Sequence, residues 1–354
     1  MVRQQAKRER RRLLKGLAVP PPSEISELKA KAEAGDPAAQ FALGRAYDDG
    51  NGVAQSDKSA SLWYLKAAEQ AYALAENSLG VMYREGRGVE QSKEQAVEWY
   101  KKAAKQKNST AMFNLGTAYY NGDGVSLNDI TAYAWFLLAQ QYGSEPAQAA
   151  VKRMSAEVKG WQLSSALETV GEMYLGGSDL PRDYSEAINW YRKAAQEGDA
   201  AVQIKLAKLL ARPEGAQNYQ EARHWCEEAA KQMFSPGAFC VGLMYERGLG
   251  VEQNLPEAAK WFNQAAQLGN AEAMSHLAEM YWKGSGVKLD RISAYTFVLL
   301  ASTANIPQAQ QDKALYEKEL NSKELEKARK RAADWVRQHP ALALRKKTLS
   351  PDRR

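Results

Sequence analysis

A large aromatic residue recurs along this chain at nearly constant intervals. The successive steps are 36, 36, 55, 35, 36 and 36 residues. The recurring position is occupied by Trp63, Trp99, Trp135, Trp190, Trp225, Trp261 and Phe297. A fixed period in the thirties indicates an array of helical repeats, each of which buries its apolar face only by stacking on its neighbours. The sequence therefore predicts an all-α protein of about seven helix-turn-helix repeats.

Each repeat carries the same internal pattern, which the first repeat illustrates. Residues 38–47 have apolar side chains at helical spacing and include Gly44. A glycine inside a helix costs about 1 kcal/mol relative to alanine, which is tolerable where a bulky side chain presses on the bare backbone. A second helix over 57–70 places Trp63 on its buried face. Because the connecting turn is short, the two helices are expected to be antiparallel neighbours.

The turn between the two helices reads Gly-x-Gly-Val in five of the repeats. In the second repeat, Gly86 and Gly88 should adopt the positive φ that a tight turn needs, whereas the intervening Arg87 should tolerate substitution. The fourth repeat has residues 176–180 and the fifth has residues 212–215 in place of this turn. We expect altered loops there and no loss of a repeat.

The full motif is Ala-x-x-x-Leu-Gly-x-x-Tyr-x-x-Gly-x-Gly-Val followed by Ala-x-x-Trp-Tyr-x-Lys-Ala-Ala. It resembles the SEL-one-like repeat (SLR), a relative of the tetratricopeptide repeat, and its best copies are residues 75–104 and 238–266. The resemblance covers about residues 23–335. It implies an α/α superhelical solenoid with a C-terminal helical cap, in a family whose members serve as adaptors in many pathways.

Repeat spacing and composition divide the chain into six segments. The 55-residue step after Trp135 and the sequence after Phe297 share a pattern that resembles the terminal cap of an SLR block. Ser155 and Asn321 are expected to be helix N-caps in these two segments. The expected segments are a basic N-terminal tail at 1–22, a capping half repeat with repeats one to three at 23–142, a junction helix at 143–165, repeats four to seven at 166–304, C-terminal cap helices at 305–338 and a basic tail at 339–354.

The net charge of +6 is concentrated at the two ends. Residues 1–16 carry a net +6 and residues 341–354 a net +4, which leaves the remainder at −4. Such tails are compatible with binding to nucleic acid or to an anionic membrane surface. They contain no aromatic residues to stack on bases, so nucleic acid is the less favoured partner.

The sequence contains no membrane span, because no stretch approaches ~18 apolar residues. Residues 13–19 are too short an apolar run for a secretory signal. The chain as given is therefore expected in the cytoplasm, and a periplasmic or secreted location is the alternative if a signal was trimmed or replaced.

The residues that could carry redox or metal chemistry are sparse. Cys226 and Cys240 fall on helices that should be neighbours, so a bridge is conceivable, but the other repeats contain no matching cysteine pair. We expect two buried free thiols. The three histidines are far apart and have no metal-ligand spacing. No cofactor and no metal are predicted.

Two classes of function compete. The favoured one is a non-catalytic scaffold or adaptor, including a regulator or an immunity protein of an effector, that binds another protein in a concave groove. The alternative is a hydrolase acting on cell-wall or β-lactam substrates. Ser26 and Lys29 match a Ser-x-x-Lys motif of penicillin-recognising enzymes but lack the partner motifs of that class. The chain is therefore predicted not to be an enzyme.

If the likeness to tetratricopeptide repeats holds, the first helix of each repeat lines the groove. Outward positions then include large residues that the packing pattern does not require, and aromatic and arginine side chains are preferred anchors of interfaces. Asp48 belongs to the same outward set. The aromatic residues could instead pack between adjacent first helices. The expected partner-binding residues are Phe41, Arg45, Asn77, Arg84, Phe113, Tyr120, Phe239, Arg247 and Trp282.

Overall fold

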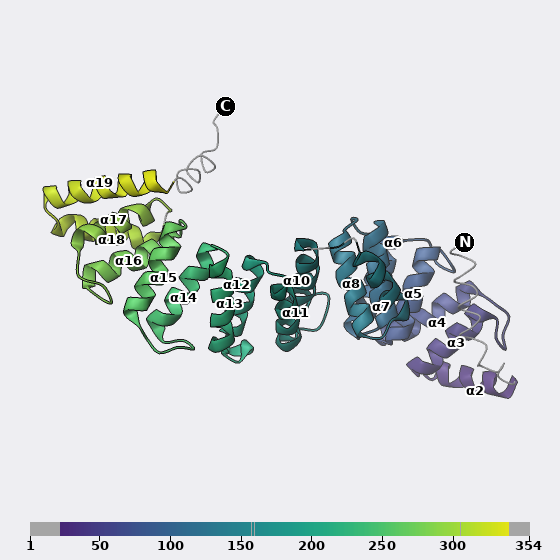
Figure 1. Ribbon diagram of the computed structural model, residues 1–354. Helices are drawn as coiled ribbons and strands as arrows, with labels where there is room; N and C mark the ends of the chain where they lie inside the picture. The colour runs from purple at the N-terminus through teal and green to yellow at the C-terminus, as the bar shows by residue number, and fades with distance from the viewer. Residues whose placement is uncertain (1–21, 157, 159, 305, 340–354) are drawn as a thin grey trace, which may run out of the picture. The chain divides into compact units, whose positions relative to one another are not determined.

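The computed structural model describes residues 22–156, 158, 160–304 and 306–339. Every regular element in these ranges is helical, and none of them is a strand (Figure 1). The predicted all-α class and the repeated helix pairs are confirmed. The chain divides into two compact units: residues 1–162 with 172–182, and residues 163–171 with 183–354.

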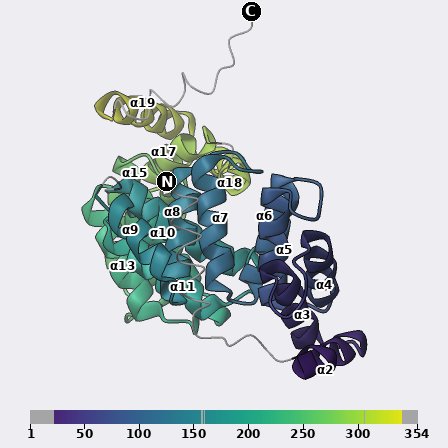
Figure 2. The same ribbon diagram turned by 90° about the vertical axis from the view of Figure 1, so that its right-hand side faces the viewer.

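The first unit is a succession of antiparallel helix pairs. Figure 2 shows α2 to α6 following one another in chain order. The first and second helices of a repeat pack together, and each second helix also packs on the first helix of the next repeat. The helices are α2 (Pro22–Glu33), α3 (Pro37–Asp49), α4 (Asp57–Glu69), α5 (Ala73–Glu85), α6 (Lys93–Lys105), α7 (Ser109–Asn121), α8 (Asp129–Gln141) and α9 (Glu145–Met154).

The second unit repeats this arrangement and closes with two packed helices. The helix α10 (Trp161–Gly176) contributes residues to both units. The helices α18 and α19 pack on α17 and form the C-terminal cap. The elements are α11 (Tyr184–Gln196), α12 (Ala200–Leu210), the short 3₁₀ helix η1 (Pro213–Gly215), α13 (Tyr219–Lys231), α14 (Ser235–Arg247), α15 (Leu255–Gln267), α16 (Ala271–Lys283), α17 (Arg291–Ser302), α18 (Pro307–Glu319) and α19 (Ser322–Gln338).

Side-chain caps and glycine turns set the ends of these helices. Asn321 caps α19 in a reciprocal capping box with Glu324, as predicted. The Ser155 prediction is wrong: Ser144 caps the start of α9, and Ser155 lies at its end. The helix ends at Met154, so its free amide groups lie at the other end, and the residue that caps them is Ser144, eleven positions before Ser155. In the second-repeat turn, Gly86 and Gly88 both adopt φ of 68°, which confirms the predicted left-handed conformation.

In the first, second and sixth repeats the buried aromatic residue is the one directly after the recurring tryptophan, whereas Trp135 of the third repeat is itself buried. Tyr100 on α6 is buried and lies over Gly80 of α5, whereas Trp99 is half-buried. The Lys102 ammonium lies 3.6 Å from the centroid of the Trp99 ring. Trp63 in the first repeat is half-buried in the same way, which corrects the expectation that it lies on the buried face of its helix. The side chain that faces the bare glycine backbone is the one enclosed by both helices of the repeat.

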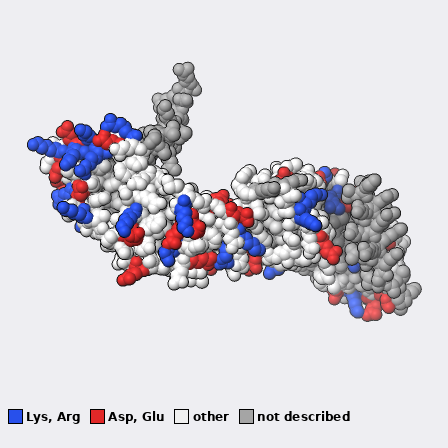
Figure 3. All heavy atoms as spheres, in the orientation of Figure 1, with Lys and Arg blue, Asp and Glu red and all other residues white. Residues whose placement is uncertain are grey.

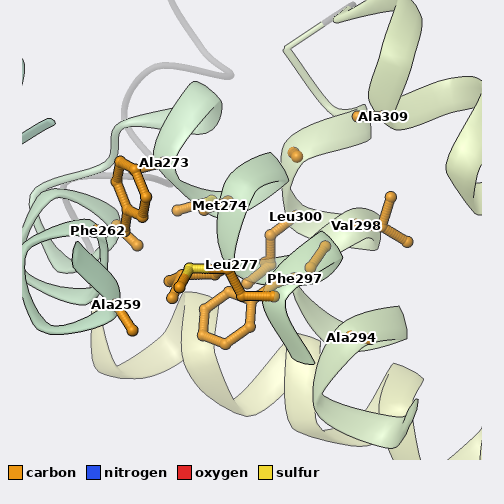
Figure 4. Packing of buried hydrophobic residues seen from close by; sticks show 14 of the residues in the cluster. Ala259, Phe262, Ala273, Met274, Leu277, Ala294, Phe297, Val298, Leu300 and Ala309 are labelled. Atoms are coloured by element: carbon orange, nitrogen blue, oxygen red, sulfur yellow. The ribbon is translucent and has the colours of Figure 1, made fainter. Parts of the chain in front are cut away.

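The same packing continues in the second unit. Phe262 of α15, Leu277 of α16 and Phe297 of α17 belong to one apolar cluster, in which Figure 4 shows Leu277 and Phe297 side by side. Phe262 and Leu277 are almost fully buried. Because each of these helices supplies one side of a shared apolar cluster, no helix pair buries its core alone.

Cys226 on α13 and Cys240 on α14 form a disulfide, with Cα atoms 5.8 Å apart. The prediction of two free thiols is therefore wrong. It depended on the absence of matching pairs in the other repeats. A bridge requires only two positions on adjacent helices at a suitable distance, and α13 and α14 pack directly against each other.

Candidate protein-binding site

An apolar pocket of about 390 Å³ opens in the first unit. Phe113 lies on its wall, with its ring centroid 5.5 Å from that of Phe136. Tyr120 is 41% exposed, and the Arg153 guanidinium lies 5.7 Å from its ring centroid. The pocket can take a large apolar side chain with a cation beside it. It is lined by Phe113, Thr117, Tyr120, Asn121, Phe136, Pro146, Ala149, Ala150 and Arg153.

A polar pocket of about 320 Å³ adjoins it, and Thr117 and Asn121 line both. Lys93 Nζ lies 2.5 Å from Asp123 Oδ1 across this pocket. The Arg84 guanidinium pairs with Glu85 at 3.1 Å. The pocket therefore contains two cations and two carboxylates. It is lined by Arg84, Glu85, Lys93, Ala96, Val97, Tyr100, Asn114, Thr117, Ala118, Asn121 and Asp123.

Tyr100 is the most enclosed polar side chain on the wall of the polar pocket, with 1% of its surface exposed. Burial raises the pKa of Tyr100 to about 12; the nearby Arg84 opposes this shift and Glu85 adds to it. The hydroxyl therefore stays protonated at neutral pH and remains a hydrogen-bond donor.

The structure brings together part of the expected binding set. Phe113 and Tyr120 line the apolar pocket, and Arg84 lines the polar pocket. Asn77 lies beside them on α5, where its side chain accepts a hydrogen bond of 2.9 Å from Asn114. These four residues come from successive first helices, α5 and α7.

Two expected residues of α3 lie outside both pockets. The Phe41 ring packs 5.7 Å from Tyr64 and 5.4 Å from Tyr72, so it fills space between helices. Arg45 is half-buried. For Phe41, packing between adjacent repeats accounts for the large side chain.

The three expected residues of the second unit form a different set of contacts. Phe239 lies 5.8 Å from Phe262 and 5.5 Å from His276, ring centroid to ring centroid. Trp282 stacks on Tyr316 of the cap at 3.8 Å. Arg247 is exposed at the end of α14. The two aromatic residues are engaged in packing, as the packing alternative supposed.

Asp48 does not point outward as expected. It is buried, forms an ion pair with Arg87 of the next repeat, and accepts a 3.3 Å hydrogen bond from the Tyr64 hydroxyl. The expectation that Arg87 tolerates substitution is also inconsistent with this contact. The turn of the second repeat folds back over the first, which brings a guanidinium to the carboxylate.

Sequence reasoning missed the side of the apolar pocket that α8 and α9 supply. Phe136, Pro146 and Arg153 line it together with Phe113. The available signal was the extra sequence after Trp135. An additional helix at that position has to lie beside the preceding first helix, and its side chains then border the same surface.

The described residues also bear on metal binding, on the Ser-x-x-Lys motif and on membrane spanning. Within the described residues, no cluster of three or more His, Cys, Asp or Glu side chains could hold a metal ion. Ser26 and Lys29 lie on α2, and neither lines the two pockets. None of the described helices is both long and apolar enough to cross a membrane.

The basic tails at 1–16 and 341–354 lie outside the described residues. In the described part, Lys and Arg side chains gather over α19, which precedes the second tail (Figure 3). The Arg331 guanidinium there lies 3.5 Å from Asp290, so part of this charge is paired within the protein.

The family described as Sel1 repeat matches more than half of the chain. The matching stretches are residues 37–72, 73–108, 109–139, 164–199, 200–232, 236–270 and 271–305.

Curated relatives match over shorter regions. The chitin synthase regulator SKT5 of Saccharomyces cerevisiae is 30% identical over 112 residues, which is 30% of this chain and 16% of that protein. The DAP3-binding cell death enhancer 1 of Mus musculus is 32% identical over 105 residues, which is 30% of this chain and 20% of that protein. The chain thus matches a fifth or less of the length of each.

Solved structures align over longer stretches. The c5321 protective antigen of uropathogenic Escherichia coli, which displays an SLR fold, is 27% identical and has a TM-score of 0.48. That alignment covers 96% of this chain and 77% of the antigen. The immunity protein Pa5087 of Pseudomonas aeruginosa is 18% identical, with a TM-score of 0.30 and coverage of 67% and 82%.

Proposed function

The chain belongs to the Sel1 repeat family, and from that premise we propose that it is a non-catalytic scaffold that binds a segment of a partner protein across the two adjoining pockets of its first unit. Sel1 repeat proteins are typically protein-interaction scaffolds. The observation that carries the proposal is the junction of an aromatic-walled pocket with a polar one at Thr117 and Asn121.

The chemistry of the apolar pocket suits an anchoring side chain. Phe113 and Phe136 offer ring surfaces, and Arg153 adds a guanidinium beside Tyr120. Large side chains seated in such pockets dominate the binding energy of protein interfaces. A partner segment that inserts one apolar residue here would continue directly into the polar pocket, where amide, hydroxyl and charged groups can bind its polar atoms.

The same residues argue against hydrolysis at this site. Neither pocket is lined by a serine, cysteine or histidine. A hydrolase of the proposed alternative class needs a nucleophile within reach of a base. The names of the relatives, a chitin synthase regulator and a DAP3-binding protein, also support a regulatory or binding role.

The proposal is tested with a partner identified by photo-crosslinking from position 120 in the native host. Calorimetric titration of that partner should show that Tyr120→Ala with Arg84→Ala weakens binding by about 2 kcal/mol or more. Leu62→Ala is the matched control, because Leu62 is 52% exposed and lines neither pocket. Equal affinity of the double variant and the wild type would move the interface elsewhere.

The disulfide gives an indication of the cellular compartment in which the protein resides. Disulfides persist in oxidising compartments and are rare in the cytosol, so Cys226–Cys240 supports the periplasmic or secreted alternative. Thiol alkylation in intact cells, followed by electrophoresis with and without reductant, tests this. Quantitative alkylation of both cysteines without reductant would favour the cytoplasm.

A further inference from the structure

Equivalent tyrosines of the first two repeats have different surroundings. The Tyr64 hydroxyl donates to the Asp48 carboxylate at 3.3 Å, and that carboxylate also pairs with Arg87. The Tyr100 hydroxyl is equally enclosed, but it has no hydrogen-bond partner within the described part of the chain. Buried hydroxyls in native proteins nearly always have a partner, so this one requires an explanation.

The explanation is that equivalent positions of successive repeats carry side chains of opposite charge. Asp48 lies four residues after Gly44, and the same position after Gly80 is Arg84. Arg87 lies between the two glycines of its turn, and the same position in the third repeat is Asp123. Asp123 is held by Lys93, and Arg84 pairs with Glu85. The second repeat thus has the tyrosine and an arginine but lacks the carboxylate that joins them in the first.

We propose that the polar pocket is a subsite for an acidic side chain of the partner segment, whose carboxylate accepts a hydrogen bond from Tyr100 and pairs with Arg84. This rests on the proposed function and deepens it, because it names the chemistry recognised beside the apolar anchor. The bound carboxylate would occupy, in the second repeat, the place that Asp48 holds in the first.

The pocket can accommodate such a group. Its volume of about 320 Å³ is ample for an aspartate or glutamate side chain. Arg84 is 35% exposed and its partner Glu85 is 42% exposed, so this surface ion pair can open and let the guanidinium turn toward a ligand. Glu85 and Asp123 also face the pocket. The first repeat shows that a buried carboxylate can lie close to other acidic groups. Arg87, the partner of Asp48, also lies 3.6 Å from Glu85 and 3.8 Å from Asp57.

The binding test uses fluorescein-labelled, C-terminally amidated peptides in which phenylalanine and glutamate are separated by zero to two glycines. Each has a counterpart with glutamine in place of glutamate, and affinity for the full chain is measured by fluorescence polarisation. We expect the best glutamate peptide to bind at least about tenfold more tightly than its glutamine counterpart, an advantage typical of charge-assisted hydrogen bonds. Tyr100→Phe and Arg84→Met should each abolish this advantage.

The outcomes separate the subsite from the groove. Equal binding of both peptides, with weakening by Tyr120→Ala, would overturn the subsite and leave the proposed function in place. If no peptide binds, or if Tyr120→Ala leaves the affinity unchanged, both the subsite and the proposed function are overturned. A glutamine peptide with a free C-terminal carboxylate is included, and preference for that peptide alone would assign the pocket to a chain terminus and overturn the proposal.

Thermal melts of the free protein give an independent check. Tyr64→Phe should lower the Tm, because it removes a satisfied hydrogen bond, whereas Tyr100→Phe should leave the Tm unchanged or raise it. Arg84→Asp with Asp123→Arg copies the first repeat, so it should raise the Tm and remove the preference for glutamate. Equal losses of Tm in Tyr64→Phe and Tyr100→Phe would show that the Tyr100 hydroxyl is already satisfied and would overturn the proposal.

Discussion

The ring of Tyr100 lies so close to the backbone of Gly80 that a Cβ atom at the glycine would fall 2.6 Å from Cε1 and 2.7 Å from Cδ1 of the ring. Glycine and the opposing aromatic residue are therefore a matched pair. The same contact joins Gly44 to Tyr64, Gly116 to Phe136, Gly171 to Tyr191 and Gly242 to Phe262. Where the glycine position holds alanine, at Ala207 and Ala278, the opposing position holds the smaller Cys226 and Val298.

Gly80→Ala should therefore destabilise the protein by about 1–3 kcal/mol, because the added methyl group overpacks the repeat. Adding Tyr100→Val, which copies the pair in the seventh repeat, should recover part of that loss. A double-mutant cycle from denaturant unfolding measures the coupling between the two sites. Strictly additive losses would mean that the two positions do not share one space.

Arg87→Met should destabilise by about 1–3 kcal/mol, because it leaves the buried Asp48 carboxylate without its guanidinium. Lys260→Met is the matched control, since Lys260 pairs with Glu257 at an exposed site. That change should cost less than about 0.5 kcal/mol. Urea melts of the three proteins decide the matter, and equal stability of the Arg87 variant and the control would contradict the role given to this ion pair.

Glu76→Gln should stabilise the protein at neutral pH by up to about 1 kcal/mol. Burial raises the pKa of Glu76 above its usual value, and the hydrogen bond from Gln106 and the charge of Lys102 only partly oppose this. The first repeat already uses the neutral pair, with Gln70 donating to Gln40 at 2.8 Å.

The sign follows from proton linkage. A carboxyl group with a raised pKa in the folded state favours folding while it is protonated, and this contribution is lost as the pH rises from its unfolded pKa through its folded pKa. The stability difference between Glu76→Gln and the wild type should therefore grow with pH just above 4.5 and then level off. Unfolding free energies at several pH values test this, and a constant difference would contradict it.

Reduction of the Cys226–Cys240 bridge should lower the free energy of unfolding by about 2–3 kcal/mol, because the bridge closes a short loop with a sequence separation of 14. Thermal melts with and without dithiothreitol measure the loss. A Cys226→Ala, Cys240→Ala variant should melt at the same temperature in both conditions. If the wild type were equally indifferent to the reductant, the bridge would not contribute to stability.

Much of the fold was predictable because it repeats. Gly80 and Gly86 recur with their neighbours in other repeats, so each copy supports the assignment of the others. Trp99 and Asp48 show where this inference fails. The period says which residues are equivalent, but it does not say which side of a helix meets the next repeat, and both residues lie at that boundary.

The candidate site was predictable only in part, for the same reason. Phe113, Tyr120 and Arg84 follow from the position of the first helix within each repeat. Arg153 belongs to a helix outside the period, so its approach to Tyr120 could not be read from a repeat. Phe41 occupies the position equivalent to Phe113, and Trp282 the position equivalent to Tyr120. Each of these two residues nevertheless packs on an aromatic neighbour outside the pockets.

The sequence by itself determined the all-α class, the helix pairs and their glycine turns, because these depend on local spacing and backbone conformation that every copy restates. The tertiary structure alone decided which equivalent positions differ in their contacts. Tyr64 has its carboxylate and Tyr100 does not, since the difference depends on which charges the neighbouring repeats bring together. Such contacts join residues far apart in the chain, and only packing sets their distances.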